Sequence, residues 1–218
     1  MSDLLTQLNG GSVPTLELIY MLTIAALLPS IVIMMTSFTR TIIIVSFTRN
    51  AVGVQQSPPN MVLVGISLFL TLYIMSPVIS RINEEAYQPY LRGEMTQEEA
   101  IEQMIVPLKE FMLRNTEVHT LENFVDMSGT EIEEDPMNYS LTVVVPSFMT
   151  SELKRGFMAG FFLYLPFLLV DIIVATTLMS MGMVMLPPAM VSLPFKLLLF
   201  VTVDGWELVF TNIVAGFK

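Results

Sequence analysis

The sequence predicts an all-α, membrane-associated protein made of bent helical hairpins interrupted by Pro-Pro breaks, with a small helical polar insert. Of its 218 residues 53% are hydrophobic and its mean hydropathy is +0.67, which is too apolar for an ordinary soluble domain. Uncharged runs at residues 18–39, 50–80 and 172–195 each reach the roughly 20 residues that span a bilayer. Every one of these runs contains proline, which bends or ends a helix.

Composition excludes several classes of function. The net charge is -10, and 14 of the 20 acidic residues fall within residues 82–151, so the chain lacks the basic face that nucleic acid requires. It has no cysteine, which excludes disulfides, thiolate metal sites and cysteine nucleophiles. The single histidine, His119, has no ligand-spaced partner, so we expect a solvated side chain and neither a metal site nor a bound cofactor.

The N-terminal region begins with a flexible lead at residues 1–14, which has no basic segment, so we expect no cleavable signal. A hydrophobic hairpin region follows at residues 15–81, opening with a helix at residues 15–39 that Pro29 kinks. Arg40 and Arg49 then bracket a segment too short to span a membrane. Either one long helix ends there with two interfacial arginines, or the segment is the elbow of a hairpin packed against protein.

A first Pro-Pro break lies at Pro58 and Pro59, and it separates this elbow from the next apolar run. A second break, at Pro187 and Pro188, gives the C-terminal half the same plan of helix, break and helix. Matching breaks in two halves resemble the internal repeats of transporters. The match consists of two dipeptides only, so we give a true repeat little weight.

The acidic insert covers residues 82–151, and we expect it to be a small helical domain. Thr96 and Glu99 have capping-box spacing, and apolar residues follow at helical intervals, which predicts one amphipathic helix or a helix pair joined at Pro107. A short helix is expected around residues 118–125 and a solvated loop around residues 130–138. Residues 141–146 are rich in β-branched side chains, and we expect them to enter the next helix in extended form.

The C-terminal hydrophobic hairpin region covers residues 152–218. It contains Asp171, a lone carboxylate in an apolar stretch, whose nearest downstream basic residue is Lys196. An intramembrane carboxylate suggests a function such as proton transfer, but a structural ion pair across a hairpin is the commoner outcome. Asp204 and Gly205 read as a turn.

Four methionines mark the centre of this region, at every second position from Met179 to Met185. The two prolines end the incoming helix, which we expect to start near Leu169 and stop near Gly182. In an extended segment the four thioethers would project to one side as a flexible apolar seal. Core packing is the alternative, because methionine commonly fills irregular gaps. The members of this Met-rich loop are Met179, Met181, Gly182, Met183, Val184, Met185, Pro187 and Pro188.

Seven strings in the sequence are distinctive as a set. They are Met-Met-Thr-Ser-Phe-Thr-Arg (34–40), Pro-Pro-Asn (58–60), Leu-Phe-Leu-Thr-Leu-Tyr-Ile-Met-Ser-Pro-Val (68–78), Thr-Ser-Glu-Leu-Lys (150–154), Leu-Met-Ser-Met-Gly-Met-Val-Met-Leu-Pro-Pro (178–188), Leu-Pro-Phe-Lys-Leu (193–197) and Val-Asp-Gly-Trp (203–206). Together they resemble the FliP/SctR family, the subunits of the flagellar and virulence type III export gates. The likeness covers nearly the whole chain and is closer to the flagellar branch at residues 86–89 and 111–114.

The resemblance implies a non-enzymatic subunit of the flagellar basal body in the bacterial inner membrane. A homo-oligomeric ring of about five copies would join the Q and R gate proteins and other export-apparatus membrane proteins. Unfolded flagellar proteins would pass through the middle. It also implies that the hairpins pack largely on other subunits, which makes the stranded charges Arg40, Arg49 and Glu152 candidates for assembly. In the family the polar insert, here residues 82–151, lies on the periplasmic side, and many flagellar members carry a cleavable signal.

The family's methionine loop falls on Met183, Val184 and Met185, which are therefore the expected pore gasket. Many relatives have three methionines there, so Val184 is a departure. Two other classes remain open on the residues alone. An ion-coupled secondary transporter or channel would use Asp171, and an intramembrane aspartic protease would need Asp171 and Asp204 as a pair.

Overall fold

The computed structural model describes residues 15–217 apart from Gln55 and Val184, so the expected lead at residues 1–14 lies outside the described residues. The described residues form helices joined by turns and loops and contain no strand, which confirms the all-α prediction. Its elements are α2 (Thr15–Met34), α3 (Phe38–Val52), α4 (Asn60–Ile82), the π-helix η1 (Asn83–Tyr87), α5 (Gln88–Leu91), α6 (Gln97–Arg114), α7 (Val118–Ser128), the 3-10 helix η2 (Pro136–Asn138), α8 (Leu141–Ser180), α9 (Pro188–Thr202) and α10 (Gly205–Ala215).

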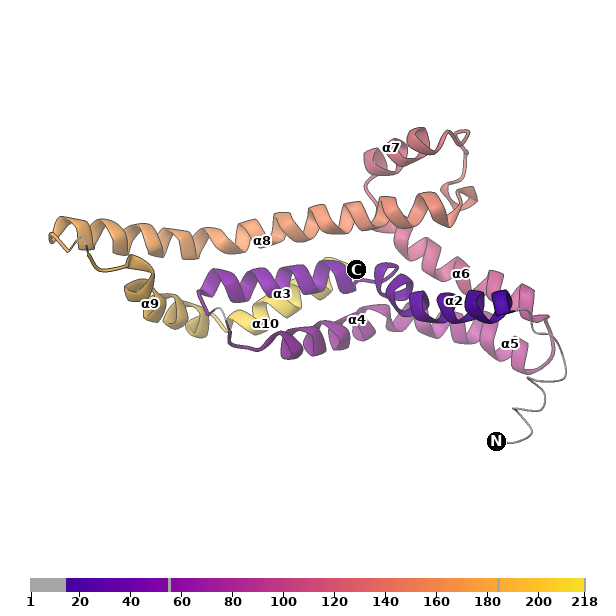
Figure 1. Ribbon diagram of the computed structural model, residues 1–218, viewed down its shortest axis with the longest axis horizontal. Helices are drawn as coiled ribbons and strands as arrows, with labels where there is room; N and C mark the ends of the chain where they lie inside the picture. The colour runs from indigo at the N-terminus through magenta and orange to yellow at the C-terminus, as the bar shows by residue number, and fades with distance from the viewer. Residues whose placement is uncertain (1–14, 55, 184, 218) are drawn as a thin grey trace.

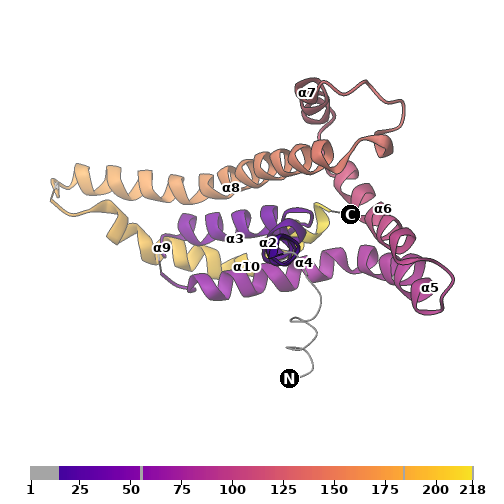
Figure 2. The ribbon, with the colours of Figure 1, turned by 45° about the vertical axis from the view of Figure 1, so that its right-hand side comes forward.

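The molecule is elongated, and α8 runs along almost its whole length (Figure 1). Helix α3 packs mainly on α8, while α4 packs on α3, and α9 folds back on α8 from the far tip. The insert helices α5, α6 and α7 gather at the opposite end, and Figure 2 shows the same separation from another side. The chain therefore has a hairpin tip at one end and a polar insert at the other.

Two described helices are long and apolar enough to cross a membrane. They are α8 and the continuous helix from Asn60 to Leu91, and the α9/α10 pair, bent by 60°, adds a third span if it is counted as one. At about 1.5 Å per residue, the 40 residues of α8 extend about 60 Å. That length is twice the roughly 30 Å of a bilayer's hydrocarbon core.

Several predicted helix boundaries are confirmed. The capping box forms, with Thr96 accepting from the Glu99 N–H while Glu99 accepts from the Thr96 N–H at 2.7 Å. Helix α6 runs without a break through Pro107, so the single-helix alternative holds. Helix α7 lies where expected, and the loop predicted at residues 130–138 is confirmed except that residues 136–138 form η2. Asp204, with a left-handed φ of 49°, turns the chain between α9 and α10.

Other boundaries differ from the predictions. The first helix ends at Met34, and a short turn separates it from α3, which carries both arginines of the elbow. Residues 141–146 are the first turns of α8, so the extended entry was wrong, as was a helix start near Leu169. Helix α8 also crosses the expected boundary between residues 151 and 152. Tertiary contacts with α3 and the insert helices explain this continuity, because they stabilise a helix that contains Pro146 and Pro166.

Two glycines allow the close packing of α3 on α8. A Cβ on Gly156 would lie 3.1 Å from the nearest Ile43 side-chain atom, and one on Gly160 would lie 2.5 Å from Phe47 Cγ. The approach therefore needs small residues on this face of α8.

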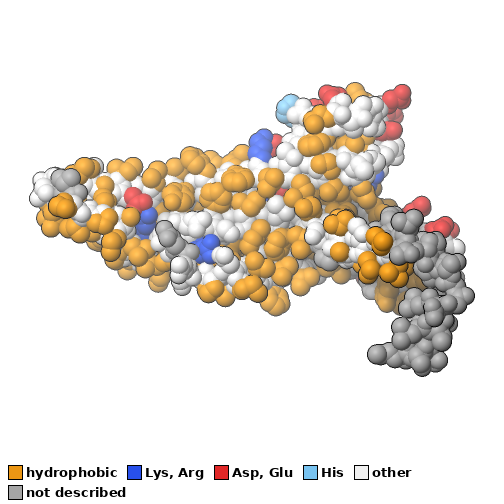
Figure 3. All heavy atoms as spheres, in the orientation of Figure 1, with side chains coloured by type: hydrophobic (Ala, Val, Ile, Leu, Met, Phe, Trp, Pro, Cys, Tyr) orange, Lys and Arg blue, Asp and Glu red, His pale blue; other side chains and the backbone are white. Residues whose placement is uncertain are grey.

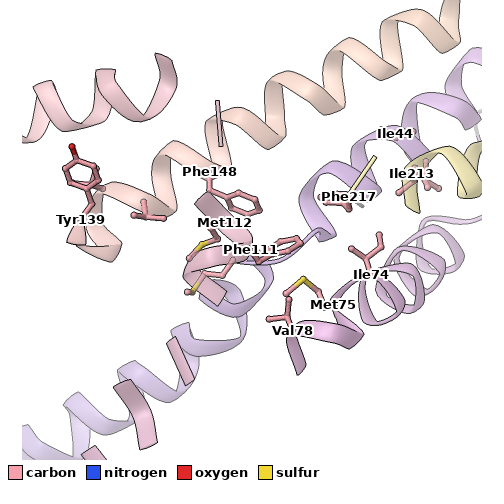
Figure 4. Packing of buried hydrophobic residues seen from close by; sticks show 14 of the residues in the cluster. Ile44, Ile74, Met75, Val78, Phe111, Met112, Tyr139, Phe148, Ile213 and Phe217 are labelled. Carbon is pink, nitrogen blue, oxygen red and sulfur yellow. The ribbon is translucent and has the colours of Figure 1, made fainter. Parts of the chain in front are cut away.

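The hydrophobic core joins the insert to the hairpins, as Figure 4 shows. Phe111 of α6 contacts Phe148 of α8 at a ring-centroid distance of 5.9 Å, and it stacks on Phe217 of the C-terminus at 6.0 Å. Met112 is fully buried beside them. The insert is thus anchored to the body through shared packing.

Much of the remaining surface is apolar. Figure 3 shows hydrophobic side chains along the whole body, while acidic side chains gather at the insert end. Met61 of α4 is 82% exposed and Phe69 is 76% exposed. Apolar faces of this extent need lipid or protein to cover them.

Candidate functional site

The methionine turn, defined here as residues 179–187, forms the tip of the α8/α9 hairpin. The α8 helix ends in a Schellman motif, in which Met183 N–H donates to the Leu178 carbonyl and Gly182 N–H to the Met179 carbonyl, both at 3.0 Å. Gly182 has a φ of +77°, and a Cβ there would meet nothing within 4 Å. The glycine is therefore needed for its left-handed backbone and not for space.

The two prolines start the return helix. Pro187 precedes α9 and accepts from Met190 N–H at 3.1 Å, and Pro188 is the first helical residue, where a missing N–H costs nothing. The glycine ends one helix and the prolines begin the next, so only a short turn separates the two.

The methionine side chains of the turn are exposed. Met183 is 44% exposed and Met185 is 99% exposed, while Val184 lies outside the described residues. The expectation of four methionines in one extended segment was wrong, because Met179 lies in the last turn of α8 and Met181 is its C-cap. Gly182 ends the helix only after those two positions.

An ion pair links the two arms of the hairpin. Lys196 Nζ of α9 lies 2.6 Å from Asp171 Oδ2 of α8, and the Ser192 hydroxyl donates to Asp171 Oδ1 at 2.6 Å. The Lys196 side chain is 7% exposed and that of Asp171 is 31% exposed. Both carboxylate oxygens thus have a partner, and neither partner is the carboxyl of Asp204.

A second ion pair links α3 to α8. Arg40 donates through two nitrogens to the two carboxylate oxygens of Glu152, and it donates a further bond to the Gly216 carbonyl at 3.0 Å. Its guanidinium also lies 3.8 Å from the centre of the Phe217 ring. Both charged residues are buried, so the bidentate geometry and the extra acceptor offset their loss of water.

Arg49 belongs to neither pair. Its guanidinium donates to the Pro58 carbonyl at 3.4 Å and to the Asn60 side-chain oxygen, so it joins the end of α3 to the start of α4. The three predicted charges at residues 40, 49 and 152 therefore occupy two separate places.

Ser192, the Gly216 carbonyl and the Phe217 ring were missed by the sequence reasoning. A local signal existed for Ser192, because it lies four residues before Lys196 and so shares its helix face. No local pattern relates Arg40 to Gly216 or Phe217, since they are about 176 residues apart and only the tertiary fold brings them together.

Comparison with known proteins shows which family the chain is related to. The sequence profile of the FliP family matches residues 21–213. The flagellar biosynthetic protein FliP of Aquifex aeolicus is 46% identical over 212 residues, which cover 96% of this chain and 89% of the relative. The FliP of Bacillus subtilis is 45% identical over 203 residues, covering 93% and 92%. That of Caulobacter vibrioides is 47% identical over 202 residues, covering 93% and 76%. The chain belongs to the FliP family.

Proposed function

We propose that this chain is a subunit of the flagellar type III export gate, in which several copies surround a closed passage for unfolded flagellar proteins. As a FliP-family protein it is a structural component of the flagellar export apparatus and not an enzyme. We further propose a role for the methionine turn, the chains that contact this subunit and its location in the cell.

The exposure of Met185 at the tip of a rigidly capped hairpin is the observation that carries the proposal. A thioether is flexible, apolar and polarizable, so it adapts to irregular neighbours. Turns from several subunits would close a narrow hydrophobic constriction that excludes water and ions, and their side chains would part around an arriving chain. Met183, Val184 and Met185 would supply this seal.

The length of α8 supports a multi-subunit assembly. A helix of about 60 Å exceeds the bilayer core, and its exposed apolar side chains continue along the hairpin tip. Its exposed large apolar side chains run from Leu153 to Met179, about 39 Å, which is longer than the hydrocarbon core. We therefore propose that other protein chains cover part of this face. These chains would be further copies in a ring, the Q and R proteins, and other membrane proteins of the basal body in the inner membrane.

Both ion pairs would serve this assembly as structural ties. The pair between Asp171 and Lys196 would fix the angle of the hairpin that presents the turn, and the pair between Arg40 and Glu152 would hold α3 on α8. Proton transfer through Asp171 is less well supported, because both its oxygens already accept from a cation and a hydroxyl.

Cysteine cross-linking tests the passage directly, because the sequence has no cysteine of its own. In cells with an assembled gate, Met185→Cys is combined with an export substrate that carries one cysteine and is stalled during export. We expect a disulfide between substrate and gate. Met127→Cys is the matched control, since Met127 is 78% exposed but lies in α7. Equal cross-linking at both positions would contradict a passage at the turn.

A further inference from the structure

A groove of about 400 Å³ is lined by residues of α3, α8 and α10, away from the methionine turn. Its two ends differ in chemistry. One end is polar and is lined by Arg40, Arg155 and Asn212. The other end is apolar, and the residues that line it are Ala159, Phe162, Leu163, Leu208 and Val209.

The positions on the two helices explain this division. Arg155 and Leu163 are eight residues apart on α8, which is about 12 Å along a helix. On α10 the bond from Arg40 to the Gly216 carbonyl places residue 216 at the charged end, and Leu208 lies eight residues away from it. The groove therefore runs along both helices from a charged end to an apolar end.

Among the described residues, the groups at the charged end leave one positive charge in excess. Arg40 is neutralised by Glu152, and Lys154 pairs with Glu117. Arg155 is half-buried, and within the described part of the chain it makes no hydrogen bond and no ion pair. A guanidinium with no protein partner is available to an anion, and its planar donors suit phosphate oxygens.

We propose that this groove binds an anionic phospholipid, with its phosphate on Arg155 and an acyl chain along Phe162 and Leu163. A charged end continuous with an apolar channel matches an amphiphile better than a lone carboxylate, which would leave the apolar end unfilled. Basic sites between apolar helices are known to hold acidic lipid headgroups. Such a lipid would bind as a structural element between α8 and α10, whatever the role of the methionine turn.

The test uses the full chain purified in a neutral detergent, with thermal unfolding and native mass spectrometry as readouts. Dioleoyl phosphatidylglycerol is added, and dioleoyl phosphatidylcholine and inorganic phosphate are added in parallel. We expect phosphatidylglycerol to bind and to raise the unfolding temperature, whereas the other two do so weakly. If inorganic phosphate alone stabilised the protein to the same degree, the proposal of an amphiphilic ligand would be overturned.

Arg155→Gln is the decisive variant. It removes a charge-assisted contact, so phosphatidylglycerol should bind about tenfold more weakly. The matched control is Lys154→Gln combined with Glu117→Gln, which removes the neighbouring ion pair and leaves the net charge at this end unchanged, so affinity should stay at the level of the parent. Arg155→Lys should retain part of the affinity.

Ala159→Phe supplies a second variant that keeps both arginines and fills the apolar end. It should also weaken phosphatidylglycerol binding. Unchanged affinity in a folded Arg155→Gln or Ala159→Phe chain would overturn the proposal. The proposal would also be overturned if Arg155→Gln lost self-association but kept its lipid affinity. In that case Arg155 would pair with a carboxylate of another copy of the chain. None of these readouts depends on export, so the proposed gate stands or fails separately.

Discussion

Lys196 Nζ and Asp171 Oδ2 lie 2.6 Å apart, and they join the two arms of the hairpin whose tip is the methionine turn. The Lys196 side chain is nearly buried and that of Asp171 is about a third exposed, so the lysine depends on the carboxylate more than the carboxylate depends on the lysine. The hairpin is therefore sensitive to loss of the anion in particular.

Asp171→Asn leaves Lys196 without a counter-ion. We expect a loss of about 2 kcal/mol in the free energy of unfolding, less than for a fully buried pair because part of Asp171 meets solvent. Chemical denaturation in detergent measures this loss. The double change Asp171→Asn with Lys196→Met should recover part of it. Normal stability and assembly with export abolished would instead favour a proton-carrying role.

Gly182→Ala tests the end of α8. The left-handed backbone at this position disfavours any Cβ, so we expect a cost of about 1 kcal/mol. Gly65→Ala is the matched control, because Gly65 lies within α4 with open space around it and has no left-handed backbone. That change should stabilise the protein slightly. Equal effects at both positions would show that φ at Gly182 does not matter.

Gly160→Ala tests the close approach of α3 to α8. A methyl group there would overlap the Phe47 ring, and overpacking of this kind costs about 1–3 kcal/mol. The combination with Phe47→Leu should be less destabilised than the sum of the two single changes, as a double-mutant cycle of unfolding free energies would record. Strict additivity would mean that the two residues do not compete for space.

The capping box of α6 gives a dependence on pH. The Thr96 N–H and hydroxyl both donate to Glu99, which lowers the pKa of its carboxyl below the ordinary value of 4.5. Folding therefore favours the ionised carboxylate. Its contribution is complete above the ordinary pKa and is lost as pH falls through the lower folded value.

We expect hydrogen-exchange protection at the start of α6 to fall between neutral pH and pH values below that pKa. Glu99→Gln should make this part of the pH response flatter. The control Glu98→Gln should leave it unchanged, since Glu98 lies in the same turn but makes no contact in the box. Parallel responses in the parent and Glu99→Gln chains would exclude this carboxyl as the cause.

Local chemistry predicted much of this fold. The Thr96 cap, the two Pro-Pro breaks and the glycine stop each follow from the properties of a few adjacent residues, and all lie where expected. Pairing of Asp171 with Lys196 followed from proximity in the sequence within an apolar hairpin.

Long-range packing decided the rest. The contacts of α8 with α3 and the insert helices stabilise a single helix through Pro146, where β-branched residues had suggested extended chain. Arg40 and Glu152 are 112 residues apart, and a period or motif cannot relate residues at that separation. The groove at Arg155 likewise exists only once α10 has folded back beside α8.

The central claim is that the methionine turn closes a passage, and ion leakage through the membranes of cells with an assembled gate tests it most directly. Met183, Val184 and Met185 are changed together to glycine, and Met190→Ala in α9 of the same hairpin serves as the control. With assembly intact, the account predicts a rise in leakage for the triple variant and none for the control. Leakage equal to that of the parent in a fully assembled triple variant would contradict it.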